Sequence, residues 1–493
     1  MTARPVVVVG NGMAGSRVAD EIARRAAADL SVTVLGDEQD AAYNRVLLSS
    51  VLAGDAAVED VYLPTPGRAG NGVTVRPGTR VTRVDRDARE VLTADGGRAP
   101  YDTLVLATGS KAVVPPLSGL FPPDGPDELL PGVTVFRTLQ DCRTITAAAA
   151  GARRAVVLGG GLLGVEAARG LVARGLDVEV LHAAPHLMER QLDASAAGML
   201  ASTLESLGVT THVGARVVAV RGDARVRGVV LDDGTVVEAD VLVVACGVRP
   251  DTALAEQAGL HVDRGVVVDD ALRSVTDPDV YALGDCAQHD GQVYGLVAPA
   301  WEQAVVVADR VTGADATACY RGSRHVARLK AAGVEVASLG DPCDDAAEVV
   351  QFVDSARGKY QKLVVRDDRL VGAILLGETG TVGTLTQLYD RGAPVPADRR
   401  TLLFPRLAST PVVESPAHLP SDARICQCNG VTKADVRDSW LSGARTVDDV
   451  AAATRATTGC GGCRDAVEGV VTWLESADPD PPAERARPEA VSA

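Results

Sequence analysis

The sequence predicts an α/β protein with two similar strand–turn–helix–strand units, a small α+β region and a small helical domain rich in cysteine. The apolar run Val6–Val9 leads into a glycine-rich turn at Gly10–Gly15. The same order recurs where Ala155–Leu158 leads into Gly159–Gly164. Four cysteines that cluster late in the chain form the third observation, and they predict a separate small domain.

The length and composition are those of a multidomain globular protein. The chain has 493 residues, 46% of them hydrophobic and 23% charged, which indicates about three domains and excludes a coiled coil or a largely disordered chain. The net charge of −16 argues against nucleic acid and anionic membranes as partners. The run Val6–Val9 is too short for a signal sequence, and no stretch approaches the ~18 apolar residues of a membrane span. We therefore expect a cytoplasmic protein.

The first glycine-rich turn has the spacing of a Rossmann-like dinucleotide-binding unit. Gly10 would allow the tight turn, Gly12 would let the backbone approach a pyrophosphate, and Gly15 would let helix and strand pack closely. Free N–H groups at the start of the following helix would attract the anion. The acid expected at the end of the second strand is displaced to Asp37 or Glu38. The predicted binding residues of this unit are Gly10, Gly12, Met13, Ala14, Gly15, Asp37 and Glu38.

The second turn repeats this pattern 149 residues later. Its predicted binding residues are Gly159, Gly161, Leu162, Leu163 and Gly164. His182 holds the strand-end position where an acid would favour NADH. This histidine either faces a 2′-phosphate or caps the strand. The absence of an arginine cluster beside it favours NADH.

Three further strands end in small or acidic residues. The run 101–109 ends in Thr108-Gly109, the run 240–247 ends in Gly247, and the run 280–285 ends in Gly284-Asp285. A helix is predicted from about residue 298 to residue 310.

Residues 4 to 315 resemble the two-dinucleotide-binding flavoproteins of the pyridine-nucleotide oxidoreductase family. The resemblance implies that the first unit binds FAD and that the second binds NADH or NADPH. It places Thr108 and Gly109 beside FAD, Asp285 on its ribityl chain, and the helix at 298–310 with its N-terminus toward the flavin. Glu166 resembles the family glutamate near the nicotinamide, although an acid in a first helical turn also suits the helix dipole. The other cofactor-binding residues that we assign by resemblance are Val81, Lys111, Gly247 and Glu302.

Departures from the family pattern narrow the choice. Residues 37 to 60 contain no cysteine, which excludes the thiol mechanism of the disulfide reductases. The segment Tyr43–Ser50 resembles rubredoxin- and ferredoxin-reductase-like members, in which the arginine equivalent to Arg45 contacts FAD. The segments 185–193 and 297–304 resemble the flavoprotein half of bacterial nitrite reductase large subunits.

The cysteine cluster consists of a Cys-x-Cys pair and a Cys-x-x-Cys pair. Four thiolates suit either a [2Fe–2S] cluster or tetrahedral zinc, and metal-free thiols are the third alternative. The segment Cys428-Asn429-Gly430-Val431, which precedes a predicted helix, resembles the bacterioferritin-associated-ferredoxin-like [2Fe–2S] domain. That resemblance favours a [2Fe–2S] cluster. The predicted ligands are Cys426, Cys428, Cys460 and Cys463.

These patterns divide the chain into six parts. The FAD-binding domain is predicted at 1–115 and 246–317, and the NAD(P)H-binding domain at 116–245. The remaining predictions are a small α+β domain at 318–405, a linker at 406–423, the [2Fe–2S] domain at 424–476 and a disordered tail at 477–493.

The predicted function is NAD(P)H-dependent electron transfer through FAD and a [2Fe–2S] cluster. No cysteine follows Cys463, so we expect the chain to lack the sirohaem centre of nitrite reductases and to pass electrons to a partner protein. The same cofactor order resembles the electron-transfer subunit of assimilatory nitrate reductases, which implies a nitrate or nitrite reductase catalytic subunit as partner. A stand-alone ferredoxin or rubredoxin reductase, or a redox-sensing binding module, are the alternatives. A homodimer is compatible with the sequence.

Overall fold

The computed structural model describes residues 3–25, 29–66, 72–122, 125, 128–344, 347–405, 416–426, 428–458 and 462–477. They fall into two compact units. The first contains the described residues up to Thr379 together with Leu388–Val395. The second contains Gly380–Gln387 and the described residues from Pro396 onward.

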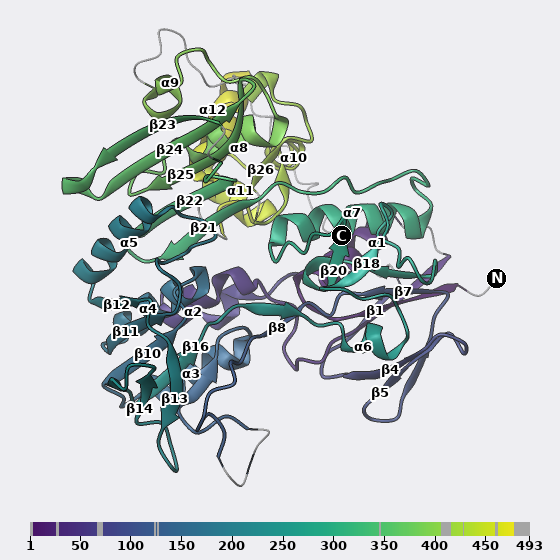
Figure 1. Cartoon of the computed structure of the whole chain (residues 1–493). Coiled ribbons are helices and arrows are strands. Elements are labelled where there is room, and N and C mark those ends of the chain that lie inside the picture. The colour runs from purple at the N-terminus through teal and green to yellow at the C-terminus, as the bar shows by residue number, and fades with distance from the viewer. Residues whose placement is uncertain are drawn as a thin grey trace, which may run out of the picture. The chain divides into compact units, whose positions relative to one another are not determined.

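A parallel five-stranded sheet carries the first glycine-rich turn (Figure 1). Its strands, in spatial order, are β19 (Val280–Ala282), β7 (Thr103–Leu106), β1 (Arg4–Val9), β2 (Leu30–Leu35) and β3 (Val73–Arg76). Valine and leucine fill both faces of the central strands, as expected of a parallel sheet covered on both sides.

Two helices of this region pack against each other, α1 (Met13–Arg25) and α7 (Val297–Thr312). Arg25 of α1 pairs with Asp309 of α7, with 2.6 Å between Nε and Oδ1. Arg17 of α1 lies over the ring of Trp301. The predicted helix after Asp285 is therefore present, and it packs against the helix that follows the first glycine-rich turn.

A second parallel five-stranded sheet carries the second glycine-rich turn. Its strands, in spatial order, are β12 (Val209–Val213), β11 (Asp177–His182), β10 (Arg154–Leu158), β16 (Val241–Val244) and β9 (Val133–Val135). The associated helices are α3 (Leu139–Ala149), α4 (Leu162–Ala173) and α5 (Ala194–Ser206). The α/β fold class with two Rossmann-like sheets is confirmed.

Shorter antiparallel elements connect and extend these sheets. Strand β8 (Ser110–Ala112) pairs with β17 (Val248–Pro250). The two three-stranded sheets are β4 (Val81–Asp85), β5 (Glu90–Thr93) and β6 (Arg98–Pro100), and β13 (Val217–Arg221), β14 (Gly228–Leu231) and β15 (Val236–Glu238). The remaining short elements are the paired β18 (Val266–Val268) and β20 (Ala287–His289), and the helices α2 (Leu48–Ala53) and α6 (Ala253–Gln257).

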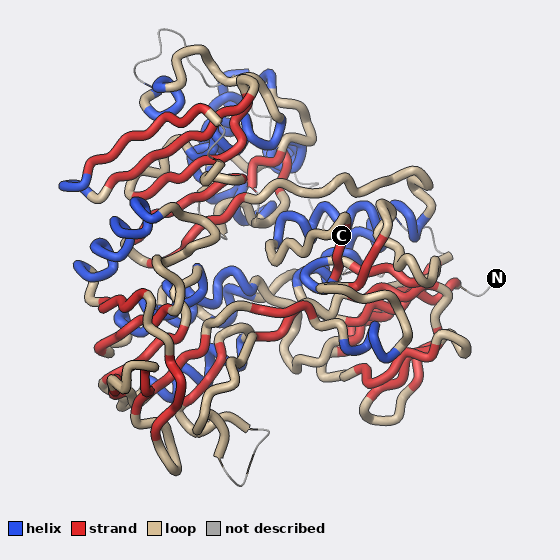
Figure 2. Tube along the Cα trace, in the orientation of Figure 1, coloured by secondary structure: helices blue, strands red, loops and turns tan. Residues whose placement is uncertain are grey.

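An antiparallel five-stranded sheet follows in the chain (Figure 2). Its spatial order is β21 (Val326–Ala331), β22 (Val334–Gly340), β25 (Arg369–Leu376), β24 (Lys359–Arg366) and β23 (Glu348–Asp354). This sheet contacts the second nucleotide unit through polar side chains: Tyr360 donates to Asp193 at 2.6 Å, and Ser338 donates to the Gln191 carbonyl at 2.8 Å. Helix α8 (Val382–Arg391) follows the sheet in the chain.

The second unit contains the cysteine-rich domain. Its elements are α9 (Arg400–Leu403), β26 (Arg424–Cys426), β27 (Val431–Thr432), α10 (Lys433–Leu441), α11 (Val447–Thr454) and α12 (Arg464–Ala477). Thr432 and Thr446 cap α10 and α11, each in a reciprocal pair of hydrogen bonds with an aspartate three residues later. The helix predicted after Val431 is present as α10.

No helix in the described parts of the chain is long and apolar enough to cross a membrane. Residues 406–415 of the predicted linker and 478–493 of the predicted tail lie outside the described residues. The domain boundaries drawn from the sequence stay predictions.

Candidate cofactor sites

The three fingerprint glycines of the first unit occupy positions that exclude a side chain or leave open space. Gly10 has φ +112°, and a Cβ there would lie 2.1 Å from the Ala107 carbonyl oxygen. A Cβ on Gly15 would lie 1.9 Å from the carbonyl oxygen of Gly10. At Gly12 the nearest atom to such a Cβ is an Arg45 nitrogen at 3.9 Å. The turn therefore packs tightly on the sheet side and stays open beside α1.

The second unit repeats this geometry. Gly159 has φ +113°, and its Cβ would lie 2.3 Å from the Ala245 carbonyl oxygen. A Cβ on Gly164 would meet the carbonyl oxygen of Gly159 at 1.9 Å, whereas one on Gly161 would have no atom within 4 Å. Leu162 and Leu163 begin α4, as Met13 and Ala14 begin α1.

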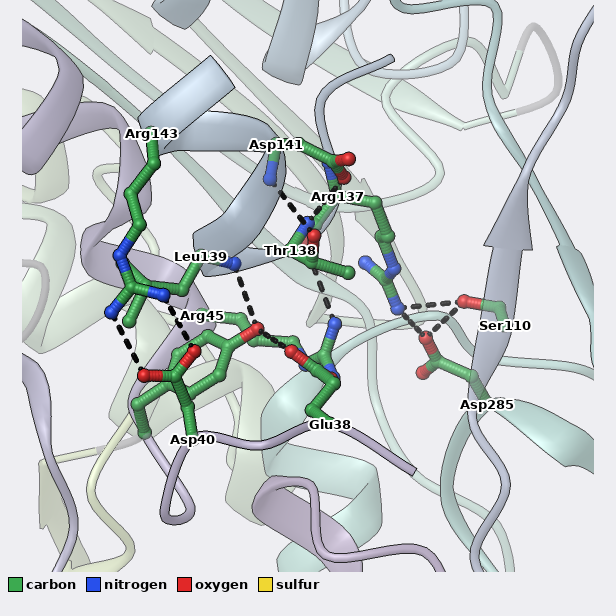
Figure 3. Close-up of polar contacts among 11 residues, drawn as sticks. Glu38, Asp40, Arg45, Ser110, Arg137, Thr138, Leu139, Asp141, Arg143 and Asp285 are labelled. Carbon is green, nitrogen blue, oxygen red and sulfur yellow. Dashed lines mark hydrogen bonds and ion pairs between the residues drawn. The ribbon is translucent and has the colours of Figure 1, made fainter. Parts of the chain in front are cut away.

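The first of the two predicted ribose-binding acids, Asp37, is exposed and lies 3.7 Å from Arg80. The second, Glu38, pairs with Arg45 and accepts a hydrogen bond from the Tyr43 hydroxyl at 2.6 Å (Figure 3). Burial raises the pKa of Tyr43, which keeps the phenol protonated as a donor. Arg45 thus stands beside Gly12 with its charge balanced by Glu38.

Asp285 lies in a polar cluster that the sequence only partly predicts. Arg137 Nη2 is 2.5 Å from Asp285 Oδ2, and the Ser110 hydroxyl donates to the same oxygen at 2.8 Å (Figure 3). The carbonyl of Arg137 accepts a hydrogen bond from Arg45. Our sequence reasoning missed Arg137 and Ser110. The available signal was the capping box Thr138–Asp141, which predicts that Arg137 stands at the start of α3.

Four other predicted cofactor-binding residues lie in the segments that follow strands β7 and β16 in the chain. Thr108 donates to the Asp251 carbonyl at 2.6 Å, and Lys111 pairs with the Asp251 carboxylate at 2.9 Å. Gly109 and Gly247 have φ +74° and +97°, and a Cβ on either would meet no atom within 4 Å.

Three predicted site residues lie elsewhere. Val81 is buried in β4 and packs in the core of the first sheet. Glu302 on α7 accepts a hydrogen bond from the Ser323 hydroxyl. Glu166 is half-buried in α4. Their roles stay predictions.

His182 is the last residue of β11 and is almost fully buried. Its Nδ1 accepts the backbone N–H of Gly160 at 3.1 Å. Its Nε2 lies 3.0 Å from a carboxylate oxygen of Glu189. The side chain of His182 therefore contacts both the second glycine turn and Glu189, a residue that the sequence did not single out.

Three of the four predicted cluster ligands are described, and all three are buried in the core of the C-terminal domain. The sulfur atoms of Cys426 and Cys428 are 3.7 Å apart, and the Thr457 N–H donates to Cys463 Sγ at 3.2 Å. Cys460 lies outside the described residues. Among the residues that are described, no group of three or more His, Cys, Asp or Glu side chains has an arrangement that could hold a metal ion.

The described cysteines fit a thiolate-bound metal. Two thiolates about 2.3 Å from one tetrahedral metal lie about 3.8 Å apart, close to the spacing of Cys426 and Cys428. A hydrogen bond with Cys428 favours the thiolate of Cys426, but the Cys463 thiol and burial together raise the pKa of Cys426 to about 11. A bound metal would remove this penalty because it replaces the protons. This geometry suits iron and zinc equally.

The glycine turns likewise fit dinucleotides. The open sides of Gly12 and Gly161 each face the start of a helix of twelve or more residues. Unpaired N–H groups there attract a diphosphate, and a side chain at either glycine would take its space. Arg45 lies beside the first turn, and the imidazole of His182 accepts a hydrogen bond from the second.

Comparison with protein families matches three segments of the chain. Residues 4–304 match the family described as Pyridine nucleotide-disulphide oxidoreductase. Residues 326–393 match the Rubredoxin NAD+ reductase C-terminal domain. Residues 424–473, which include all four predicted cluster cysteines, match the BFD-like [2Fe-2S] binding domain.

Curated relatives extend over nearly the whole chain. A nitrite reductase [NAD(P)H] of Bacillus subtilis is 38% identical over 98% of this chain. The assimilatory nitrate reductase electron transfer subunit of the same organism is 36% identical over 98% of this chain. The chain spans 59% and 61% of the length of these two relatives.

Solved structures show the same fold. A ferredoxin reductase from Rhodopseudomonas palustris has a TM-score of 0.71 and 26% identity, with 79% of this chain and 95% of that chain covered. The putidaredoxin reductase–putidaredoxin complex gives a TM-score of 0.72 at 24% identity, with 83% of this chain and 100% of that chain covered. The resemblances predicted from the sequence are confirmed.

Proposed function

The chain belongs to the pyridine nucleotide-disulphide oxidoreductase family, and we propose that it carries electrons from NADH or NADPH to a partner protein through its [2Fe–2S] domain. Its cofactors are FAD, NAD(P)H and the cluster. The observation that carries the proposal is the presence, in one chain, of two open glycine turns and a buried group of cysteines. Bound FAD accepts a hydride and releases electrons singly, which suits an iron–sulfur outlet.

The residues around the first turn supply the groups that FAD requires. We assign its diphosphate to the first N–H groups of α1 and to Arg45, which lies beside Gly12. Asp285 would accept a hydrogen bond from a hydroxyl of the ribityl chain, and Arg137 fixes the orientation of that carboxylate. Because Arg45 also bonds the Arg137 carbonyl, the two arginines form one connected support for the cofactor.

The cluster would be held by Cys426, Cys428, Cys460 and Cys463. The N–H of Thr457 already donates to Cys463, and such bonds stabilise negative charge on cysteine sulfur. Asn429 donates to the Arg455 carbonyl at 2.6 Å and so ties the first cysteine pair to the end of α11. These two hydrogen bonds hold the described backbone around Cys428 and Cys463, where we propose that the cluster binds.

The proposed acceptor is the catalytic part of a nitrite or nitrate reductase. This assignment is supported by the names of the two Bacillus subtilis relatives, which are an NAD(P)H nitrite reductase and a nitrate reductase electron transfer subunit. The net charge of −16 would direct the chain toward a basic surface of its partner. A cytoplasmic location and a homodimer belong to the same proposal.

Replacing one cluster cysteine tests the electron path. Cys428→Ser should leave flavin reduction by NADH unchanged in anaerobic absorbance titrations. It should lower iron content and reduce one-electron delivery to cytochrome c by about tenfold or more, because a serine oxygen is a poor substitute for a soft thiolate. Cys319→Ser, at an exposed cysteine outside the cluster, is the matched control. Full electron delivery by Cys428→Ser would contradict the proposal.

A second candidate is a stand-alone reductase for rubredoxin or ferredoxin. It is favoured by the match at residues 326–393 and by a rubredoxin-NAD(+) reductase of Alcanivorax borkumensis, 29% identical over 76% of this chain and 95% of its own length. This candidate predicts that Cys428→Ser still reduces rubredoxin at the wild-type rate. Our main proposal predicts that it does not.

A further inference from the structure

The second nucleotide unit lacks an acid at its strand end, and a carboxylate from the following loop takes up a neighbouring position. Gly159 N–H donates to the Leu181 carbonyl at 2.9 Å, just as Gly10 N–H donates to the Leu35 carbonyl at 2.8 Å. His182, one residue after Leu181, therefore holds the position at which an acid would contact the adenosine ribose. Its side chain is only 11% exposed.

The contacts of His182 determine its tautomer. Because Nδ1 accepts the Gly160 N–H, this nitrogen carries no proton. The ring proton is then on Nε2, which donates it to Glu189 at 3.0 Å. A ring held in this way has no second proton to offer a 2′-phosphate. His182 is thus a positioning residue that holds Glu189.

The loop that carries Glu189 is anchored against the glycine turn. Leu187 and Met188 are each 1% exposed, and the Met188 N–H donates to the Gly160 carbonyl at 3.0 Å. A Cβ on Gly160 would lie 2.5 Å from a methyl carbon of Leu187. Glu189 follows directly and keeps 41% of its side chain exposed. A carboxylate is therefore fixed beside the turn and faces solvent.

We propose that Glu189, positioned by His182, recognises the ribose diol of the adenosine half and makes the chain selective for NADH over NADPH. Its carboxylate would accept a hydrogen bond from a ribose hydroxyl, and its charge would repel a 2′-phosphate. The inference depends on the proposed function, in which the second unit binds the pyridine nucleotide. It explains how a strand that ends in histidine performs the task of one that ends in an acid.

Two other polar side chains of this loop, those of His186 and Arg190, lie near Glu189 in the sequence. The imidazole of His186 donates from Nδ1 to the Leu187 carbonyl at 3.1 Å. Arg190 is exposed and is the one cation next to Glu189 in the sequence. Because an arginine could bind a 2′-phosphate, the competing hypothesis is that Arg190 determines the nucleotide preference, and the experiment must distinguish the two residues.

The test is calorimetric titration of the FAD-loaded full chain with ADP-ribose and with 2′-phospho-ADP-ribose. The wild type should bind ADP-ribose at least about tenfold more tightly, and Glu189→Gln should reduce this ratio to about twofold, since the substitution removes the charge but keeps the size. Glu205→Gln on α5 removes an exposed charge elsewhere and should leave the ratio unchanged. His182→Ala should reduce the ratio as well, because Glu189 loses its partner.

The outcomes separate this inference from the function on which it rests. An unchanged ratio in Glu189→Gln, or a ratio that responds only to Arg190→Gln, overturns the inference while the second unit still binds nucleotide. Failure of both ligands to bind, together with failure of NADH and NADPH to reduce the flavin, overturns the proposed function and this inference with it. Stopped-flow flavin reduction by the two nucleotides should show the same change in ratio as the calorimetry.

Discussion

In the first nucleotide unit the fingerprint carries Asn11 and the second strand is followed by Gly36, whereas in the second unit Gly160 and His182 hold these positions. A Cβ on Gly36 would lie 2.6 Å from the Cβ of Asn11, and one on Gly160 would lie 3.0 Å from Cγ of His182. Each unit thus has room for one side chain between its glycine turn and the end of its second strand. In the first unit the turn supplies that side chain, Asn11, and in the second unit the strand supplies it, His182. The two units have the same backbone arrangement but fill this space with different residues.

The two units also differ in the charge beside the turn. Glu38 of the first unit pairs with Arg45, so the two side-chain charges balance. The guanidinium of Arg45 is the member of this pair that lies next to Gly12. Glu189 of the second unit has His182 as its partner, so its negative charge remains. The comparison teaches that one fold can be adapted to a retained cofactor or to an exchangeable nucleotide by changing a few side chains.

The largest effects are expected from replacing Gly15 and Gly164, each of which packs against the first glycine of its own turn. Gly15→Ala and Gly164→Ala would each bring a methyl group to 1.9 Å from a backbone oxygen, so the turn must open. We expect Gly15→Ala to lose FAD and about 3 kcal/mol of stability. Gly164→Ala should keep FAD and weaken ADP-ribose binding by about 100-fold, for the same steric reason. Flavin absorbance, calorimetry and urea unfolding measure the three quantities.

The control for these variants is a helical glycine with open space around it. Gly198 lies within α5, and a Cβ there would meet no atom within 4 Å. Gly198→Ala should therefore stabilise the protein by about 0.5 to 1 kcal/mol and leave both ligands bound. If Gly15→Ala retained FAD at the wild-type level, the tight turn would not be essential to the first site.

The sequence predicts the parts of the fold that depend on local pattern. Apolar runs followed by Gly10 or Gly159 predict both parallel sheets. The cysteine spacing, together with the helix expected after Val431, predicts the C-terminal domain. These predictions succeed because hydrophobic periodicity and glycine conformation are local properties. The order of the strands within each sheet required the structure.

The candidate sites could be predicted only where a single residue type carries the signal. Arg137 and Asp285 are far apart in the sequence, and their 2.5 Å contact arises from tertiary packing alone. The partnership of His182 with Glu189 depends on a loop anchored by buried Leu187 and Met188, the latter with φ +50°. No local pattern predicts such a backbone conformation at methionine.

A second prediction tests whether Asn11 and Gly36 really share one space. Gly36→Ala alone should cost about 2 kcal/mol, because its methyl group would lie 2.6 Å from the Asn11 side chain. The double variant Asn11→Gly/Gly36→Ala should recover at least half of that loss. Urea unfolding of the FAD-loaded protein and both single variants completes the double-mutant cycle. Additive free energies would refute the shared space.

The smallest expected effect concerns Asp40, which lies in the loop after the first unit's second strand and has no role in the glycine turn. Both oxygens of Asp40 are 2.8 Å from the Arg143 guanidinium (Figure 3). The Tyr62 hydroxyl donates to one of these oxygens. The Arg143 hydrogen bonds lower the pKa of Asp40 below its ordinary value of 3.8. Because the folded-state pKa is depressed, this stabilisation is complete above the ordinary value and is lost as the pH falls through the folded value.

Solvent reaches Arg143, so we expect Asp40→Asn to cost only about 1 kcal/mol at pH 7. The difference in unfolding free energy between wild type and variant should stay constant from about pH 8 to pH 5 and shrink below about pH 4. A difference that instead grew on acidification would show that the pair does not stabilise this loop as an ion pair.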